Sequence, residues 1–211
     1  MTSATPGFRG HHFGFSFTNT LRPSSHVADR WHTVFMGSLL IITGPPGAGK
    51  STVAKLVADA FDPSVLVHGD VFFEFLARGA IPPWLPESQA QNTIVTQATA
   101  AAVGCFTQGD YTTVFDGIVG PWFLPTFTAA AGLDTIQYVI LFPSLDARIN
   151  RIRSRIGHDF SDEAAAAKMH EEFATSLDGM DPRHVLDKPM STAAQVADHI
   201  IDQFRHGAFT L

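Results

Sequence analysis

The sequence contains one cysteine, few basic residues and no long apolar run, and each shortage excludes a class of protein. Cys105 is alone among 211 residues, so no disulfide can form within the chain, as is typical of reducing compartments. Only 14 Lys and Arg stand against 20 Asp and Glu, and no basic block offers a surface to a nucleic-acid backbone. The apolar runs are too short to cross a bilayer. We therefore expect a cytoplasmic protein that binds neither nucleic acid nor membrane.

The first 35 residues differ in composition from the rest of the chain. Residues 1–35 are rich in Gly, Ser, Thr, His and Phe and follow neither a helical nor a strand period. They also lack the apolar stretch of a signal peptide. We interpret them as a disordered extension, or as translation assigned from too early a start. Residues 36–211 are long enough for one domain with a hydrophobic core.

From Leu39 onward, short apolar runs alternate with helical patterns, which predicts parallel βαβ units. The expected strands are residues 39–43, 65–69, 112–116, 136–142 and 184–187. The expected helices are residues 50–61, 71–78, 87–107, 122–131, 145–156, 162–176 and 191–205. Residues with capping side chains precede three of these helices, namely Ser144, Ser161 and Ser191. The pattern predicts a three-layer α/β domain. We expect Cys105 to be a small core residue, because Val103 and Phe106 are typical of the buried side of a helix.

A glycine-rich segment follows the first expected strand and directly precedes a helical pattern. Residues 44–51, GPPGAGKS, match the Walker A pattern G-x-x-x-x-G-K-[ST]. Such a loop turns its N–H groups toward phosphate oxygens, and the helix N-terminus adds partial positive charge. Lys50 is expected to reach the β and γ phosphates, and the Ser51 hydroxyl to bind Mg²⁺. The residues expected to contact a nucleotide are Gly44, Pro45, Pro46, Gly47, Ala48, Gly49, Lys50, Ser51 and Thr52.

Motors, switches, transporters and kinases share this loop, so it predicts nucleoside triphosphate binding and leaves the use of the nucleotide open. A domain of this size is too small for most motor or switch assemblies. The chain also has no guanine-reading N-K-x-D sequence. These observations favour a small kinase.

Two aspartates end expected strands and should lie at the same edge of the sheet as the phosphate loop. Asp70 closes VLVHGD, and Asp116 closes TTVFD. Phosphoryl transfer to an alcohol needs a group that orients the hydroxyl and accepts its proton, and it needs Mg²⁺ between the phosphates. We expect Asp70 to act as the base and Asp116 to serve the metal, although the roles could be exchanged or each residue could cap a helix or turn. For His68, two residues before Asp70, we expect a structural hydrogen bond and not a catalytic role.

Four of the ten arginines lie within eight residues of one expected helix. Arg148, Arg151 and Arg155 fall within about 60° of one another at 3.6 residues per turn. Arginines beside a transferring phosphoryl group stabilise the charge on its oxygens. We expect Arg151 and Arg155 to be catalytic and Arg148 to contact the nucleotide, within a lid of about residues 148–170. The alternative is a solvated basic helix face.

With the loop, Asp70 and the arginine helix, residues 38–205 resemble the small P-loop kinases that phosphorylate metabolites or antibiotics. Shikimate kinases, gluconate kinases, chloramphenicol phosphotransferases and zeta-toxin sugar-nucleotide kinases belong to this AAA-like group. The resemblance implies a P-loop NTPase fold with sheet order 2-3-1-4-5, helices on both faces, a small mobile helical lid, and ATP with Mg²⁺. It also implies that Asp70 contacts the acceptor hydroxyl. The stretch 79–85 is similar to part of the gluconate kinase pattern but lacks its charged residues.

The segments between the second and third expected strands, and after the third, should form a wall opposite ATP. This wall contains Phe72, Phe73, Phe75, Trp84, Gln89, Gln91, Asn92 and residues 117–123, with Arg78 as its one cation. Aromatic surfaces with a few amides suit a neutral or partly apolar acceptor better than a multiply anionic one.

Our leading hypothesis is a monomeric or homodimeric kinase that transfers the γ-phosphate of ATP to a hydroxyl of a metabolite or antibiotic. One alternative is a toxin-type kinase that acts on a nucleotide sugar. The other is a non-catalytic ATP-binding sensor or interaction module.

Overall fold

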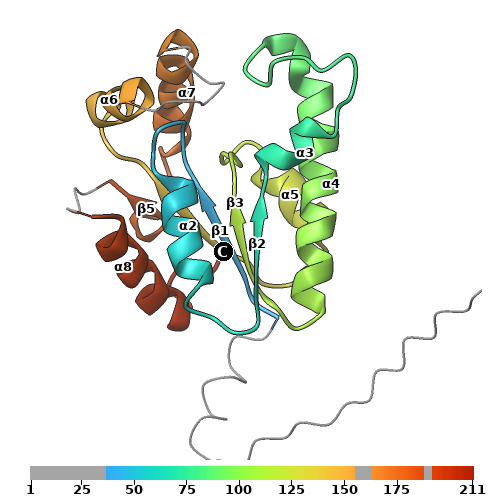
Figure 1. The fold of residues 1–211 in the computed structure, drawn as a ribbon, viewed down its shortest axis with the longest axis vertical. Coiled ribbons are helices and arrows are strands. Elements are labelled where there is room, and N and C mark those ends of the chain that lie inside the picture. The colour runs from blue at the N-terminus through green and yellow to red at the C-terminus, as the bar shows by residue number, and fades with distance from the viewer. Residues whose placement is uncertain (1–36, 155–162, 188–191) are drawn as a thin grey trace, which may run out of the picture.

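The sheet at the centre of the molecule contains five parallel strands in the order β2-β3-β1-β4-β5 (Figure 1). The computed structural model describes residues 37–154, 163–187 and 192–211, so the predicted extension of residues 1–35 lies outside it. The strands are β1 (Leu39–Thr43), β2 (Ser64–His68), β3 (Thr112–Asp116), β4 (Gln137–Leu141) and β5 (Val185–Leu186). This order confirms the sheet that the resemblance implies.

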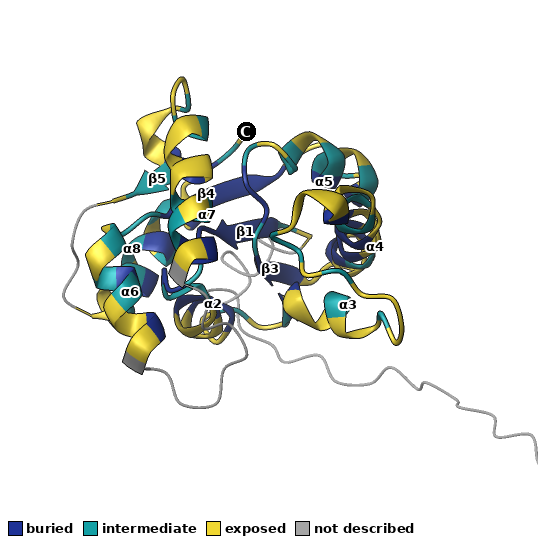
Figure 2. Cartoon of the chain, turned by 90° about the horizontal axis from the view of Figure 1, so that it is seen from above, coloured by how far each residue is buried: buried dark blue, intermediate teal, exposed yellow. Residues whose placement is uncertain are grey.

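Helices cover both faces of the sheet and complete the three-layer architecture (Figure 2). The helices are α2 (Lys50–Ala58), α3 (Asp70–Glu74), α4 (Gln89–Gln108), α5 (Leu124–Ala131), α6 (Leu145–Ser154), α7 (Glu163–Ser176) and α8 (Ala193–Arg205), with 3-10 turns η1 (Pro86–Ser88) and η2 (Pro182–His184). Within the described part of the chain, none of these helices combines the length and the apolar character that crossing a membrane needs.

The central strand β1 is buried on both faces, which explains its unbroken apolar sequence. Leu40 and Ile42 pack against α2 and α8, whereas Leu39 and Ile41 pack against α4 and α5. Side chains alternate across a strand, so one short segment supplies both halves of the hydrophobic core. The rigid strand therefore fixes where the phosphate loop begins.

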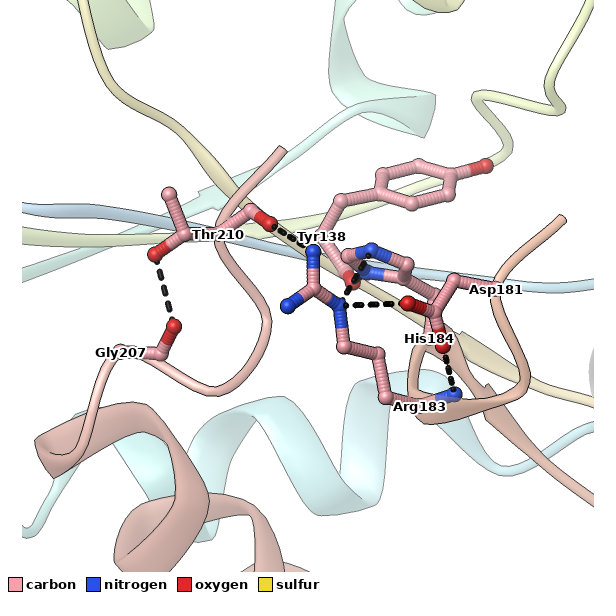
Figure 3. A network of polar contacts seen from close by, with 6 residues as sticks. All are labelled: Tyr138, Asp181, Arg183, His184, Gly207 and Thr210. Carbon is pink, nitrogen blue, oxygen red and sulfur yellow. Dashed lines mark hydrogen bonds and ion pairs between the residues drawn. The ribbon is translucent and has the colours of Figure 1, made fainter.

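A polar network fastens the C-terminus to the sheet (Figure 3). The backbone N–H of Tyr138 on β4 donates to the Phe209 carbonyl at 2.9 Å. Nδ1 of the buried His184 donates to the Tyr138 carbonyl at 2.8 Å, so its Nε2 is free to accept from Nε of Arg183 at 3.2 Å. The same guanidinium donates from Nη2 to the Thr210 carbonyl at 2.9 Å. These bonds join β4, η2 and the last residues of the chain.

Most predicted element boundaries agree with the structure to within three residues, and α3 is the largest exception. It ends at Glu74, whereas the sequence predicts a helix to residue 78. Gly79 adopts a positive φ of 73°, and Pro82 and Pro83 follow it. These residues keep the chain from the turn at Gly79 to η1 as a loop, but they do not explain why α3 already ends at Glu74.

Two expectations about single residues need correction or completion. Cys105 is exposed on α4, so the prediction of a core cysteine is wrong: Val103 is buried, but Phe106 also faces outward. At α8 the cap is Thr192, whose side chain accepts from the Gln195 N–H in a capping box. The predicted caps Ser161 and Ser191 lie outside the described residues, and Ser144 accepts from Ala147 N as expected, at 3.4 Å.

Candidate active site

The phosphate loop connects β1 to α2 and is closed by its own backbone. The Ala48 N–H donates to the Pro45 carbonyl at 3.2 Å. No side chain caps the N-terminus of α2, so its first N–H groups remain open to an anion. Gly47 has a φ of 78°, and a Cβ at this position would lie 2.8 Å from the Arg148 carbonyl oxygen. A glycine is therefore required at 47 both for the backbone angle and for the close approach of α6.

Lys50 and Ser51 begin α2 and line a cleft above the loop. Nζ of Lys50 donates to the Pro45 carbonyl at 3.3 Å, which holds the ammonium group beside the loop. Ser51 is exposed to the cleft, and Thr52 is exposed one residue further along the helix. The loop thus has the donors that the sequence predicts for a phosphate site.

Asp116 ends β3 beside β1 and is held by a histidine. In the sheet it pairs with Ile42 on one side and His68 on the other. Its Oδ2 lies 3.0 Å from Nδ1 of His68, so His68 makes the structural hydrogen bond that its sequence context favours. Asp116 is 5% exposed and His68 46% exposed, which leaves the histidine toward solvent and the carboxylate toward the cleft lining.

Asp70 is the first residue of α3 and is exposed in the same cleft. The turn before it is tight, because Gly69 donates its N–H to the Asp116 carbonyl at 2.8 Å. This bond extends the pairing of β2 with β3 and joins the residue before Asp70 to the end of β3. The structure therefore brings Asp70, Asp116, Lys50 and Ser51 to one edge of the sheet.

The arginine helix α6 packs directly on the phosphate loop. Nη1 of Arg148 donates to the Pro46 carbonyl at 3.2 Å, and Nη1 of Arg151 donates to the Ala48 carbonyl at 3.2 Å. Both guanidinium groups therefore donate to carbonyl oxygens of the loop, which carry negative partial charge. Arg155 lies outside the described residues.

Arg148 is fully buried, and its positive charge affects a histidine on α7. Desolvation lowers the pKa of its guanidinium to about 10, and Nε and Nη2 have no hydrogen-bond partner. The neighbouring His170 stacks on Phe142 with ring centroids 4.7 Å apart. Burial and, after it, the charge of Arg148 lower the pKa of His170, against a smaller opposite effect of Glu171.

The cleft joins the phosphate loop to the predicted acceptor wall and has a volume of about 900 Å³. Its elements stand on both sides of the carboxyl ends of the strands, α6 and α7 on one side and α3 and α4 on the other (Figure 1). Of the predicted wall, the cleft is lined by Phe73, Trp84, Gln89, Asn92, Gly117, Ile118, Val119, Trp122 and Phe123. Phe72, Phe75, Arg78 and Gln91 lie outside the lining.

Gln91 has a structural role instead. Its side-chain amide makes two hydrogen bonds with the backbone of Ile81, at 2.8 and 2.7 Å, and so holds the loop before η1. Sequence reasoning missed Glu74, Lys168, Met169 and Glu172, which also line the cleft. Of these residues, only Glu74 had a recognisable signal in the sequence: it follows Asp70 by four residues, which places both on one face of a helix.

Ser51 and Asp116 fit the site of a magnesium ion. A hydroxyl and a carboxylate are hard oxygen donors, and both line the cleft next to the loop that would hold phosphates. Mg²⁺ commonly takes only one or two protein ligands and completes its shell with phosphate oxygens and water.

Comparison with known proteins agrees with this fold. A family model described as an AAA domain matches residues 40–170. The cytidylate kinase of Archaeoglobus fulgidus is 27% identical over 135 residues, which are 64% of this chain and 71% of that protein. The tunicamycin resistance protein of Deinococcus radiodurans superposes with a TM-score of 0.58 at 17% identity, covering 79% of this chain and 95% of that chain. A shikimate kinase from Acinetobacter baumannii, solved with shikimate, gives 0.55 at 15% identity, covering 83% and 98%.

The AAA domain match spans more than half of the chain and includes the phosphate loop, both strand-end aspartates and α6. The two structural likenesses are distant in sequence and show the fold. The chain therefore belongs to the AAA domain family, and its fold is that of the small P-loop kinases.

Proposed function

We propose that the protein is a kinase that transfers the γ-phosphate of ATP to a hydroxyl group of a small molecule. The observation that carries this proposal is the shared cleft of Lys50, Ser51, Asp70 and Asp116 at the carboxyl edge of the sheet. A phosphate-binding loop, a metal-compatible pair and a free carboxylate are the parts that phosphoryl transfer to an alcohol requires.

The loop and α6 hold the triphosphate. The open N–H groups of α2 and Nζ of Lys50 bind the β and γ phosphates. Arg151, now bonded to loop carbonyls, exchanges these partners for phosphate oxygens as charge develops on them. Arg148 holds α6 against the loop from its buried position. Arg155, which lies outside the described residues, remains a candidate for a further positive charge at the phosphates.

Ser51 and Asp116 hold the magnesium ion, which neutralises charge on the β and γ phosphates when bound. Asp116 suits this role better than Asp70, because β3 lies directly beside β1 and the phosphate loop. The His68 hydrogen bond fixes its carboxylate and leaves Oδ1 available.

Asp70 orients the acceptor hydroxyl and takes its proton. The acceptor oxygen attacks the γ-phosphorus while the bond from that phosphorus to the bridging oxygen breaks, and ADP leaves. Asp70 is exposed in the cleft, so an acceptor can reach it without displacing protein contacts. General-base assistance of this kind contributes about 10²- to 10⁴-fold to the rate.

The test is acceptor-dependent release of ADP from the intact protein with ATP and Mg²⁺. The acceptor panel contains CMP, shikimate, gluconate, a nucleotide sugar and a set of uncharged alcohols. We expect Asp70→Asn to lose at least about 100-fold in transfer while it keeps ATP binding. Lys50→Ala loses both, and Lys55→Ala, an exposed change on the same helix, loses neither.

Full transfer by Asp70→Asn would remove the base assignment. Tight ATP binding without ADP release for any acceptor would favour the sensor hypothesis over a kinase. Transfer to the nucleotide sugar alone would favour the toxin-type kinase.

A further inference from the structure

The part of the cleft beyond Asp70 is enclosed mainly by aromatic and aliphatic side chains. They come from α3, from the loop before η1, from α4 and from the loop after β3, and they include Phe73, Trp84, Leu85, Val95, Ile118 and Trp122. Because these segments are separate in sequence, the apolar surface surrounds the acceptor space from several sides. A wall of this kind binds an apolar body by excluding water from both surfaces.

Positive charge is scarce in this part of the cleft. Among the described lining residues the cations are Lys50, which belongs to the phosphate loop, and Lys168 on α7. Nζ of Lys168 lies 4.0 Å from a carboxylate oxygen of Glu172, which also lines the cleft, so a negative charge stands beside this cation. Arg78, the cation expected from the sequence, lies outside the lining. A phosphate or carboxylate on the acceptor would find no arginine fork in the described wall.

Negative charge, in contrast, faces the acceptor space. Glu74 follows Asp70 by four residues on α3, so both carboxylates lie on one face of the helix, and both line the cleft. An anionic acceptor placed with its hydroxyl at Asp70 would stand against two like charges. Such juxtaposition disfavours binding strongly in a partly desolvated site.

Several hydrogen-bond donors of the wall are already bonded within the protein. Nδ2 of Asn92 donates to the Pro83 carbonyl at 2.8 Å and to Ser88 Oγ at 2.9 Å. Ser88 Oγ itself donates to the Leu85 carbonyl at 2.7 Å, and Thr99 Oγ1 donates within its own helix. These donors are therefore not free for the many hydroxyl groups of a polyol, whereas Asn92 Oδ1, which is buried without a partner, can accept from a single hydroxyl.

From these observations we propose that the phosphate acceptor is an uncharged alcohol with a large apolar body, and not a sugar acid, a carboxylate or a nucleotide. This inference rests on the proposed kinase function and names its substrate class. The apolar wall holds the body, Glu74 and Asp70 reject anions, and the hydroxyl meets Asp70 at the phosphate end of the cleft.

A matched pair of fluorescent probes tests the charge preference directly. N-phenyl-1-naphthylamine is uncharged, and 8-anilino-1-naphthalenesulfonate is the same molecule with an added sulfonate. Both are titrated into the full chain with Mg²⁺ and saturating AMP-PCP, so that the phosphate loop is filled. We expect the uncharged probe to bind at least about tenfold more tightly. Equal or tighter binding of the sulfonate would overturn the inference.

A charge reversal locates the effect in the cleft. Glu74→Lys should tighten binding of the sulfonate probe by about tenfold and change the uncharged probe little. Glu87→Lys is the matched control, because Glu87 is exposed on η1 and lies outside the lining. An equal response of the two variants would mean that the probes bind elsewhere and would contradict the inference.

Separate measurements distinguish this inference from the kinase proposal. AMP-PCP binding by calorimetry and ADP release report on the kinase function and do not involve the probes. Efficient transfer to CMP, shikimate or gluconate would sustain the kinase proposal and overturn the acceptor class. Failure to bind AMP-PCP would overturn the kinase proposal, while the probe pair still reports the preference of the cleft.

Discussion

The hydrogen bond between His68 and Asp116 joins the ends of two neighbouring strands at the point where the sheet meets the cleft. A buried carboxylate that must face a metal needs a partner that fixes its orientation, and a histidine N–H supplies one. His68 lies outside the cleft lining, so it acts through Asp116 and not on the substrate. It is a positioning residue for the proposed metal site.

Loss of this bond should change the magnesium requirement. We expect His68→Ala to lower turnover by about tenfold and to raise the Mg²⁺ concentration needed for half-maximal ADP release. His68→Asn can still donate an N–H at the Nδ1 position and should restore much of the activity. If the magnesium curve of His68→Ala matches that of the unchanged protein, the positioning role is wrong.

Gly47 allows the close contact between the phosphate loop and α6. Gly47→Ala adds a Cβ that would lie 2.8 Å from the Arg148 carbonyl oxygen, at a φ of 78°. We expect it to lower the free energy of unfolding by about 2 kcal/mol and to weaken AMP-PCP binding.

Gly79→Ala is the matched control for this substitution. Gly79 has a φ of 73°, but nothing lies within 4 Å of an added Cβ. It should therefore show the backbone strain alone, about 1 kcal/mol, with normal nucleotide binding. Urea denaturation and calorimetry measure both effects, and equal losses in the two variants would rule out the α6 contact as the cause.

Arg148 on α6 and His170 on α7 are two basic residues on neighbouring helices, and protonation of the histidine would place two positive charges beside each other. Arg148 on α6 and His170 on α7 lie close enough for the arginine charge to lower the pKa of the histidine. Nδ1 of His170 is buried without a partner, so a proton there gains no compensating hydrogen bond. Neutral His170 therefore favours the packed arrangement of α6 and α7.

The lowered pKa predicts a dependence of stability on pH. The unfolded chain takes up a proton near the ordinary value of about 6.5, and the folded chain does so only at lower pH. The free energy of unfolding should therefore fall as the pH drops through 6.5 toward the folded pKa.

Replacement of His170 isolates this effect from that of the other histidines. His170→Phe keeps a ring against Phe142 and should flatten the fall in melting temperature between pH 7.5 and 5.5. His206→Phe replaces an exposed histidine after α8 and is the matched control for the substitution itself. A curve for His170→Phe that parallels the unchanged protein would contradict the assignment.

Periodic elements and the phosphate loop could be predicted from the sequence because their signals are local. The β-forming residues of β1 and β3 and the glycines before Lys50 are each recognised within a few consecutive residues. The outward position of Cys105 could not be predicted in this way, because α4 is nearly uniform in hydrophobicity and its buried face is chosen by α5 and the sheet. The sequence likewise left open where α3 ends.

Cleft-lining residues that follow strands could be predicted from the sequence, and those that distant segments bring to the cleft could not. Asp70 and Asp116 follow strands, so their shared edge follows from the parallel sheet. Lys168 and Glu172 reach the cleft from α7, and Gln91 turns from the expected wall to hold a loop. These outcomes depend on tertiary packing, which has no signature in a single segment.

At the scale of the whole molecule, the last residues of the chain close the core beneath α8. Phe209 is 2% exposed within the cluster formed by β1, α2 and α8. The N–H of Leu211 donates to the Ile136 carbonyl at 3.1 Å, and Thr210 forms an antiparallel bridge with Gln137. The C-terminus is therefore part of the fold.

Truncation of the buried ring should destabilise the whole domain. We expect Phe209→Ala to lower the free energy of unfolding by about 3–5 kcal/mol. Leu211→Ala, two residues later and 52% exposed, should change it by less than about 0.5 kcal/mol. Chemical denaturation of both variants measures the difference, and a small effect at Phe209 would mean that the tail does not contribute to the core.

The exposed position of Cys105 gives the unaltered chain a single attachment point for a thiol-reactive dye. No other cysteine competes for the reagent. Cys105 lies six residues beyond Thr99, the last residue of α4 that lines the cleft, which is about 9 Å along the helix. A fluorophore there leaves the cleft open, so single-molecule measurements of ligand exchange can use the native sequence.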